Sequence, residues 1–218
     1  MITVLNKSKS LFNTYLSETR DENIQNNHCR FRRNMERMGS VFAYEISKQM
    51  QFSVHEVSTP FGIAKEEVIS QPPVVISVMR SGLPLQTGVL DFFDSASAGF
   101  ISLNHDYDKK GNMQVSLEYV SLPSIHEKEL ILCDAMIASG ESMALAYKSL
   151  ITRGTPTHVH LVALIASKEG LANLRKKLPT KRVSLWLGAI DDELTAKSYI
   201  VPGMGDAGDL AFGAKDTE

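Results

Sequence analysis

The strongest constraint on the fold is an alternation of apolar runs and amphipathic segments that begins at residue 74. Each apolar run is short and typical of a buried parallel strand, and the segments between the runs have helical spacing. Strands that alternate with helices form a mainly parallel sheet with helices on both faces, so we expect an α/β fold. The expected strands are 74–79, 98–103, 129–134, 159–166 and 183–187, and the expected helices are 83–93, 143–153 and 170–178.

The region before residue 74 has a different pattern. Residues 1–28 are polar and mixed, which predicts an extended arm or a short helix. An amphipathic helix is predicted over roughly 28–50, because apolar residues recur there at steps of three and four. These apolar residues are Phe31, Met35, Met38, Phe42 and Ile46. The opposite face is basic and is interpreted as solvated; it carries Arg32, Arg33, Glu36, Arg37 and Lys48.

Two later segments are not part of this alternation. A turn signal at 109–112 precedes an alternating stretch, which predicts a hairpin around 104–122 that projects from the core. Residues 199–213 are rich in glycine and are expected to form an ordered loop. Without repeats or linkers, the chain is expected to be a single domain. It would comprise an N-terminal arm and helix at 1–70, an α/β core at 74–190 and a C-terminal loop at 191–218.

Composition excludes several classes of protein. The 218 residues are 43% hydrophobic and 22% charged, with 23 basic and 25 acidic residues and a net charge of −2. This balance does not favour a nucleic-acid partner. The two cysteines, Cys29 and Cys133, form neither a disulfide framework nor a zinc motif. The N-terminus has no signal-peptide pattern and there is no long apolar run, so we expect a cytoplasmic location and no membrane partner.

The segment from residue 131 to 142 carries the clearest chemical pattern. An apolar strand ends in Asp134, and small residues then lead into a helix. Backbone N–H groups in such a loop, with the positive end of the helix, suit a phosphate monoester. Ser139 and Ser142 add hydroxyl donors, and Asp134 can accept from ribose hydroxyls. The pattern favours a sugar phosphate, with a plain strand–loop–helix junction as the alternative.

Two further segments follow the same logic, because ligands bind outside the carboxyl ends of the strands in such sheets. Arg80 follows the first strand, and its guanidinium with nearby backbone N–H groups would make an anion clamp. The glycines of 199–209 would let the main chain approach a flat base and read its edge. A glycine-rich C-terminal turn is the alternative interpretation of this last segment.

Together these three segments resemble the uracil phosphoribosyltransferase family, a branch of the type I phosphoribosyltransferases. Residues 131–142 resemble the loop that binds phosphoribosyl pyrophosphate (PRPP), usually Asp-Pro-Met-Leu-Ala-Thr-Gly-Gly-Ser in this branch. Residues 79–83 resemble the Leu-Arg-Ala-Gly-Leu loop, and residues 199–209 the uracil-binding loop. The resemblance covers nearly the whole chain. Weaker matches are Thr19–Asn23, Ala43–Glu45, Gly188–Asp191 and Phe212–Gly213.

The resemblance implies a type I fold, with a mainly parallel sheet flanked by helices, a projecting β-hairpin and a hood of N- and C-terminal segments. It implies the pyrimidine salvage reaction of uracil with PRPP to give UMP and pyrophosphate. The implied PRPP-binding residues are Arg80, His105, Asp134, Ala135, Met136, Ile137, Ala138, Ser139, Gly140, Glu141, Ser142 and Asp206. The implied uracil-binding residues are Tyr199, Ile200, Gly205, Asp206 and Ala207.

The resemblance also implies a cofactor and partners. Mg²⁺ would be bound mainly through PRPP, without direct protein ligands. A homodimer or a higher homo-oligomer is expected, with GTP as a candidate effector. The hairpin around 104–122 would serve subunit pairing, or alternatively would act as a lid.

The chain departs from the family pattern at three positions. Glu141 replaces a glycine, and a carboxylate beside a bound phosphate is repulsive unless it points away. His105 replaces an arginine, and a neutral imidazole is the poorer anion partner. Ala135 replaces a proline. The first two changes favour an alternative function, a non-catalytic nucleotide sensor or RNA-binding regulator. Its RNA contacts would come from Arg30, Arg32, Arg33 and Arg37. A second alternative is a transferase for another base, although residues 199–209 argue against purines.

Overall fold

The computed structural model describes residues 1–107, 113–179 and 181–215. Its centre is a seven-stranded sheet in the order β1-β9-β8-β7-β4-β5-β6. Every neighbouring pair is parallel except β5 and β6, which are antiparallel. The strands are β1 (Ile2–Val4), β4 (Val74–Met79), β5 (Ser97–Tyr107), β6 (Met113–Ser121), β7 (Glu129–Ile137), β8 (His158–Ser167) and β9 (Val183–Asp191). The predicted α/β fold is confirmed.

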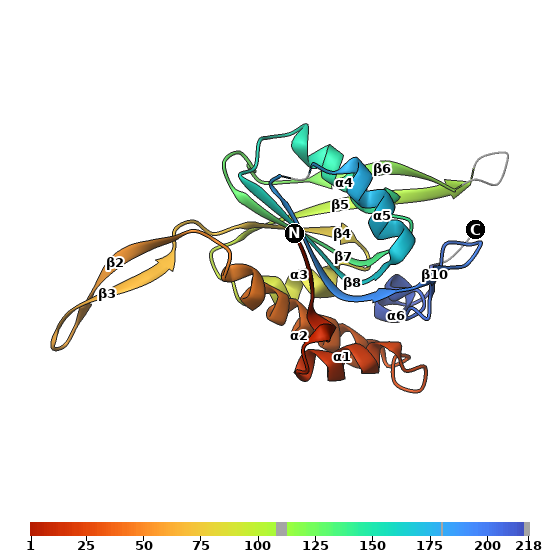
Figure 1. Cartoon of the computed structure of the whole chain (residues 1–218), viewed down its shortest axis with the longest axis horizontal. Coiled ribbons are helices and arrows are strands. Elements are labelled where there is room, and N and C mark those ends of the chain that lie inside the picture. Colours follow the sequence, from red (N-terminus) through yellow and green to blue (C-terminus); the bar gives the residue numbers. More distant parts are fainter. Residues whose placement is uncertain (108–112, 180, 216–218) are drawn as a thin grey trace.

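Helices cover both faces of this sheet (Figure 1). The lower face in that view carries α1 (Leu11–Arg20), α2 (His28–Ser47) and α3 (Leu83–Leu90), and the upper face carries α4 (Glu141–Ile151) and α5 (Lys168–Lys177). Side chains alternate between the two layers along each strand. In β7, Ile131 and Cys133 pack in the core with α1, α2 and α3, whereas Leu130 and Leu132 pack with α4 and α5. The core strands are therefore apolar on both faces.

The amphipathic helix predicted over 28–50 is α2, and its predicted apolar residues are all buried. The first residue of α2 contacts the C-terminal segment, because His28 Nδ1 lies 2.7 Å from the carbonyl oxygen of Leu210. Residues 1–28, expected to be an extended arm or a short helix, contain β1, the 3₁₀ turn η1 (Leu5–Lys7) and α1. Because residues 1–28 are polar and mixed, the sequence did not predict β1, which pairs with β9 at the edge of the main sheet.

An antiparallel hairpin of β2 (Phe52–Thr59) and β3 (Gly62–Ile69) lies outside the main sheet and was not predicted. Figure 1 shows that it extends well away from the rest of the molecule. We call this hairpin the arm. Its exposed apolar side chains are Phe52, Val54, Val57, Phe61 and Ile63. The arm joins the sheet at the amino end of β4.

The hairpin predicted around 104–122 is formed by β5 and β6. Up to Ser102, β5 also pairs with β4, and beyond that residue it pairs only with β6. The prediction of a projecting hairpin therefore holds for its outer half, while the inner half is the edge of the main sheet. The turn predicted at 109–112 lies outside the described residues.

The C-terminal segment is more regular than the loop expected for 199–213. It contains two short strands, β10 (Glu193–Leu194) and β11 (Ile200–Val201), and then helix α6 (Ala207–Phe212). Asp206 caps α6, since its Oδ1 accepts hydrogen bonds from the N–H groups of Gly208 and Asp209. Among the described helices, none is long and apolar enough to cross a membrane.

Candidate active site

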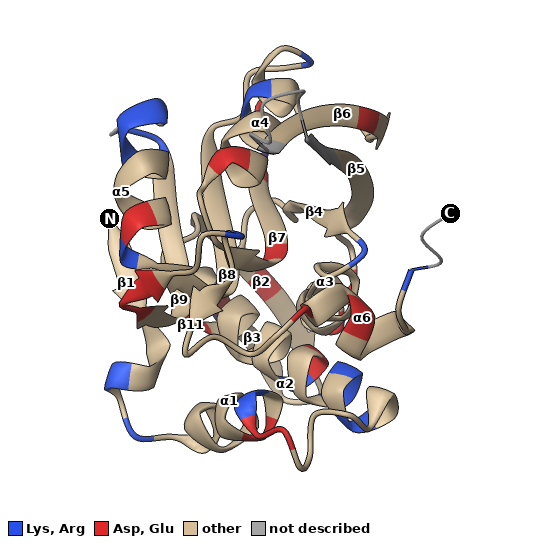
Figure 2. Ribbon diagram, turned by 90° about the vertical axis from the view of Figure 1, so that its right-hand side faces the viewer, with Lys and Arg blue, Asp and Glu red and all other residues tan. Residues whose placement is uncertain are grey.

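The three segments identified from the sequence meet beyond the carboxyl ends of β4 and β7, where α6 also lies (Figure 2). Ser81, just after β4, donates from Oγ to Oδ1 of Asp134 over 2.9 Å. Arg80 donates from Nη2 to Oδ1 of Asp209 over 2.7 Å, and from Nη1 to the carbonyl oxygen of Gly213 over 3.2 Å. The first loop therefore contacts both the segment after β7 and the C-terminal segment.

The segment after Asp134 is shorter as a loop than predicted. The strand β7 continues to Ile137, so the loop proper is Ala138 to Gly140. The extension arises because Met136 and Ile137 still pair with β8. The side chains of Ala135 and Ile137 are buried in the core, so these two residues can offer only main-chain groups to a ligand.

The loop at 138–140 is held against the start of α5. Ser167 Oγ donates to the carbonyl oxygen of Ala138 over 2.6 Å and accepts from the N–H of Gly170 over 2.8 Å. Gly140 has a φ of +84°, and a Cβ there would lie 2.6 Å from the carbonyl oxygen of Gly170. Glycine is therefore required at 140 for both its conformation and its lack of a side chain. The chain then enters α4 with the first-turn N–H groups directed at the loop.

Asp134 is buried beside this loop. Burial raises the pKa of its carboxyl group to about 6, although hydrogen bonds from Ser81 and from the main-chain N–H groups of Ala135 and Met136 oppose the shift. Its carboxylate is thus oriented by the loop after β4 and by its own strand. An oriented acid next to a phosphate-type loop can accept hydrogen bonds from sugar hydroxyls.

The glycine-rich C-terminal loop is anchored by an ion pair that the sequence did not reveal. Arg20 donates from both Nη atoms to Asp191, over 2.7 and 2.8 Å, and also to the carbonyl oxygen of Gly203 over 2.8 Å. Asp191 accepts from the N–H of Gly203 as well. Asp191 is buried. The weaker family matches at 19–23 and 188–191 contain both residues and were the available signal.

The residues predicted to contact uracil follow this anchor. The side chains of Ile200 and Ala207 are buried, so these two residues offer main-chain groups to a ligand. Tyr199 is exposed, and its N–H donates to Thr195. Gly205 is exposed with a φ of +81°. Asp206 is exposed, with one carboxylate oxygen committed to capping α6.

Sequence comparison decides the family. The model of the family described as uracil phosphoribosyltransferase matches residues 6–214. The chain belongs to the uracil phosphoribosyltransferase family. The predicted family and enzyme class are thereby confirmed.

Relatives and solved structures agree with this assignment. The uracil phosphoribosyltransferase of Porphyromonas gingivalis is 44% identical over 211 residues, covering 97% of each chain. The enzyme of the same name from Thermococcus gammatolerans is 30% identical and covers 91% of this chain and 88% of the relative. A solved structure of a protein from Aquifex aeolicus has a TM-score of 0.87 at 26% identity over the full length of both chains. A Staphylococcus aureus hypoxanthine phosphoribosyltransferase, at 11% identity over 73% of this chain and 74% of its own, has a TM-score of 0.50 and shares the fold.

The departure from the family pattern at Glu141 is accommodated by the backbone. Glu141 is the first residue of α4, and the positive φ at this junction belongs to Gly140. The Glu141 carboxylate forms an ion pair with Lys177 at the end of α5. Glu141 therefore needs no left-handed conformation, and its carboxylate has a cation beside it.

The second departure, His105, lies on the outer part of the β5–β6 hairpin. Its backbone pairs with Val115, three positions beyond the last pairing of β5 with β4. The His105 side chain lies outside the described part of the structure. Its contact with PRPP stays a prediction.

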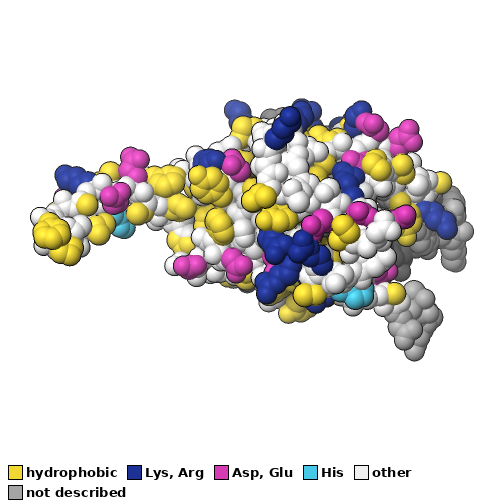
Figure 3. Space-filling model, turned by 90° about the horizontal axis from the view of Figure 1, so that it is seen from below, with side chains coloured by type: hydrophobic (Ala, Val, Ile, Leu, Met, Phe, Trp, Pro, Cys, Tyr) yellow, Lys and Arg dark blue, Asp and Glu magenta, His cyan; other side chains and the backbone are white. Residues whose placement is uncertain are grey.

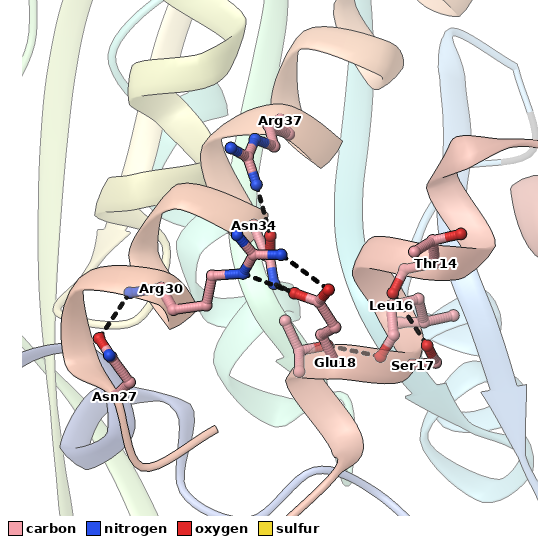
Figure 4. A network of polar contacts seen from close by, with 9 residues as sticks. Thr14, Leu16, Ser17, Glu18, Asn27, Arg30, Asn34 and Arg37 are labelled. Carbon is pink, nitrogen blue, oxygen red and sulfur yellow. Dashed lines mark hydrogen bonds and ion pairs between the residues drawn. The ribbon is translucent and has the colours of Figure 1, made fainter. Parts of the chain in front are cut away.

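The basic face of α2 is largely occupied by contacts within the chain (Figure 4). Arg30 forms two hydrogen bonds with Glu18, which hold the pKa of that carboxyl group at about 2. Arg32 donates to the carbonyl oxygen of Ala211. The other two predicted RNA contacts are also engaged: Arg33 pairs with Glu36, and Arg37 bonds Asn34 and lies over the ring of Tyr15. Figure 3 shows Lys and Arg side chains gathered on this face with acidic side chains beside them. This arrangement weakens the RNA-binding alternative.

His158 and His160 lie on one face of β8, with their ring centroids 4.6 Å apart. The strand β8 lies between β7 and β9, and His160 is buried. Trp186 donates to Nδ1 of His160 over 3.0 Å, and Nε2 of His160 lies 3.0 Å from Glu129. No group of three or more potential metal ligands occurs in the part of the chain that the structure describes.

Proposed function

We propose that this chain transfers the phosphoribosyl group of PRPP to uracil and forms UMP and pyrophosphate in pyrimidine salvage. The observation that carries the proposal is the meeting of three family segments at one end of the sheet. Asp134 is joined to the loop after β4 through Ser81, and that same loop is joined to α6 through Arg80. A single substrate could therefore contact all three segments.

The loop after β7 would hold the 5′-phosphate and the ribose. Main-chain N–H groups of 138–142 and the positive end of α4 suit a phosphate, and the hydroxyl groups of Ser139 and Ser142 can add donors. Asp134 would accept from the ribose hydroxyls. Its pKa of about 6 leaves it mostly ionised at neutral pH, as that role requires.

Pyrophosphate and uracil would bind on the other side of the ribose. Arg80 would turn part of its guanidinium to the pyrophosphate, with Asp206 as a further PRPP contact. The main chain of 199–207 would bind uracil. A backbone N–H directed at O4 of uracil would reject cytosine, because cytosine presents an amino group there and two donors would face one another.

The reaction is a substitution at the anomeric carbon of PRPP. A ring nitrogen of uracil forms the new C–N bond and loses its proton, while the anomeric C–O bond breaks and its electron pair leaves with pyrophosphate. Positive charge develops on the ribose, as in glycoside hydrolysis. No covalent nucleophile is needed, so the work of the protein is to align the two substrates and stabilise the leaving group.

Magnesium fits the residues present. Mg²⁺ commonly binds through one or two carboxylates together with substrate phosphates, and it keeps several waters. Asp134 and Asp206 are carboxylates of the segments proposed to hold PRPP, and the described residues contain no group of three or more potential metal ligands, so Mg²⁺ would be held mainly through PRPP. Bound with PRPP, the metal would neutralise charge on the leaving pyrophosphate.

We also propose that the chain forms a homo-oligomer in which the arm packs on a second copy. An isolated two-stranded hairpin is marginally stable in water, yet the arm carries Phe61 fully exposed, together with exposed Val54 and Ile63. Val54→Asp with Ile63→Asp would shift the chain to a smaller species in sedimentation velocity. Lys65→Asp on the same arm is the control. An unchanged sedimentation coefficient for the double variant would exclude the arm as the interface.

The activity is tested with purified chain, Mg²⁺, PRPP and radiolabelled uracil, with cytosine and orotate as comparators. We expect UMP from uracil alone. The same assay with added GTP tests the predicted effector. We also propose a cytoplasmic location, which is compatible with the two free cysteines. Folded protein that binds UMP but forms no product with any base would overturn the enzyme and favour a nucleotide sensor.

A further inference from the structure

Glu141 places a negative charge at the start of the helix proposed to hold phosphate. An α-helix carries the equivalent of about half a positive charge at its N-terminus. A full carboxylate charge in the first turn would exceed that half charge and would repel a phosphate. The family pattern avoids this conflict with a glycine, and this chain must resolve it in another way.

The structure provides one cation for this carboxylate. The ammonium group of Lys177 contacts Oε1 of Glu141, and the two side chains come from different helices, α5 and α4. With Lys177 included, the pair has no net charge, and the helix end again dominates the local field. The two side chains remain partly exposed, at 34% and 49%, so the pair is expected to add little to folding stability.

The surroundings leave Glu141 free to choose other orientations. A cavity of about 340 Å³ lies between α4 and β6 and is lined by Gln114, Glu141, Lys148 and Lys177. Packing against neighbours therefore does not fix the carboxylate. Lys148 lies two turns further along α4, whereas Lys177 is the residue whose contact with Glu141 is observed.

We propose that Lys177 is a positioning residue for PRPP: it neutralises Glu141 and holds the carboxylate toward α5, away from the phosphate loop. This inference rests on the proposed function. It identifies a pair of residues that together replace the family glycine. Lys177 acts through Glu141, and neither residue needs to touch the substrate.

The test is the affinity of the full-length protein for Mg²⁺-PRPP, measured by calorimetry without uracil, together with kcat and KM. Lys177→Met should raise Kd and KM for PRPP about five- to tenfold, with kcat and the KM for uracil nearly unchanged. Lys177→Arg should restore the affinity. Lys176→Met, an exposed position on the same helix, is the matched control and should have no effect.

A double variant separates the proposed role from direct binding. Glu141→Gln in the Lys177→Met background should return the PRPP affinity to within about twofold of the original protein, because no charge then needs neutralising. The Lys177→Met defect should also shrink between about 50 mM and about 500 mM salt, as for a screened charge.

The outcomes are distinct. If Lys177→Met binds PRPP as well as the original protein, or if Glu141→Gln fails to rescue it, the inference is wrong and the proposed function stands. If the original protein neither binds PRPP nor forms UMP, the proposed function fails and the inference fails with it. Unfolding in urea, monitored for each variant, identifies any loss caused by misfolding.

Discussion

The guanidinium of Arg80 lies 2.7 Å from the carboxylate of Asp209, so the residue that follows β4 is tied to the last helix of the chain. Both side chains are partly exposed. Through this pair, the proposed pyrophosphate site and the proposed uracil site share one contact. A displacement of the loop after β4 would therefore also displace α6, and the reverse.

The first prediction concerns this pair. Arg80→Ala should lower kcat/KM by about 100- to 1,000-fold, the usual loss when a transition-state charge partner is removed. Asp209→Asn should lower it by about tenfold, because Arg80 loses an ionic partner that orients it. Steady-state kinetics with varied PRPP measures both effects. Arg33→Ala, on the exposed face of α2, is the control. Full activity of Arg80→Ala would remove this residue from the site.

The second prediction concerns Asp134 and pH. Its pKa is 3.8 in an unperturbed chain and about 6 in the fold, so the native state binds more protons between these values. Stability from this group is therefore present below about pH 4 and is lost as pH rises through 6. Asp134→Asn should be more stable than the original protein above pH 6 by on the order of 2 to 3 kcal/mol, and the difference should vanish near pH 4.

Urea denaturation at a series of pH values measures this difference. Asp94→Asn, an exposed acid, is the control and should show no such trend. A constant difference between Asp134→Asn and the original protein across pH 4 to 7 would contradict the raised pKa. The variant should also lose PRPP binding, since an amide is a weaker acceptor for ribose hydroxyls.

The third prediction concerns the anchor of the uracil loop. Arg20→Met leaves Asp191 buried without its cation and should cost about 2 to 4 kcal/mol of unfolding free energy. The KM for uracil should rise more than the KM for PRPP, because Arg20 also holds Gly203. The exposed pair of Lys168 and Asp192 provides the control, and Lys168→Met should destabilise the protein much less than Arg20→Met. If Arg20→Met loses no more unfolding free energy than Lys168→Met, the ion pair of Arg20 with Asp191 does not stabilise the fold.

The fourth prediction compares two glycines with nearly the same φ. Gly140→Ala should cost more than about 2 kcal/mol, since it adds a clash with Gly170 to the left-handed conformation. Gly205→Ala, whose added Cβ would lie 3.6 Å from Cδ1 of Leu210, should cost only about 1 kcal/mol. Chemical denaturation of both variants gives the comparison. Similar costs would mean that the loop at 138–140 can move away from α5.

Much of the sheet was predictable because its strands are buried on both faces. The runs at 74–79 and 159–166 read as continuous apolar segments, and each matches an observed strand to within a residue at either end. The end of β7 was placed three residues early. The sequence analysis assigned the residues after Asp134 to a loop of small residues, but pairing of Met136 and Ile137 with β8 keeps the chain extended as far as Ile137.

Long-range partners could not be predicted from local patterns. Arg20 and Asp191 are far apart in sequence, and each alone resembles an ordinary surface charge. The arm was missed for a different reason. Its apolar side chains are exposed, so β2 and β3 do not have one buried and one solvated face. The alternation of apolar and polar residues that identifies a half-buried strand is therefore weak in these two strands.

The candidate site was predicted from two kinds of signal, the residues that follow the strands and the resemblance to the family. The position of Asp134 follows from the general rule that ligands bind beyond the carboxyl ends of parallel strands. The roles of Tyr199 and Ile200 came from resemblance alone, because main-chain recognition leaves no side-chain signature. The neutral pairing of Glu141 required the structure, since Lys177 comes from another helix.

The parallel pairing of β1 with β9 has a consequence for synthesis on the ribosome. Ile2 pairs with Leu185 and Val4 with Leu187, so β1 emerges early and has no partner until almost all of the chain has been made. Such distant contacts slow folding, and an unpaired strand edge invites association with other nascent chains. A chain released before β9 is complete should therefore be a substrate for chaperones.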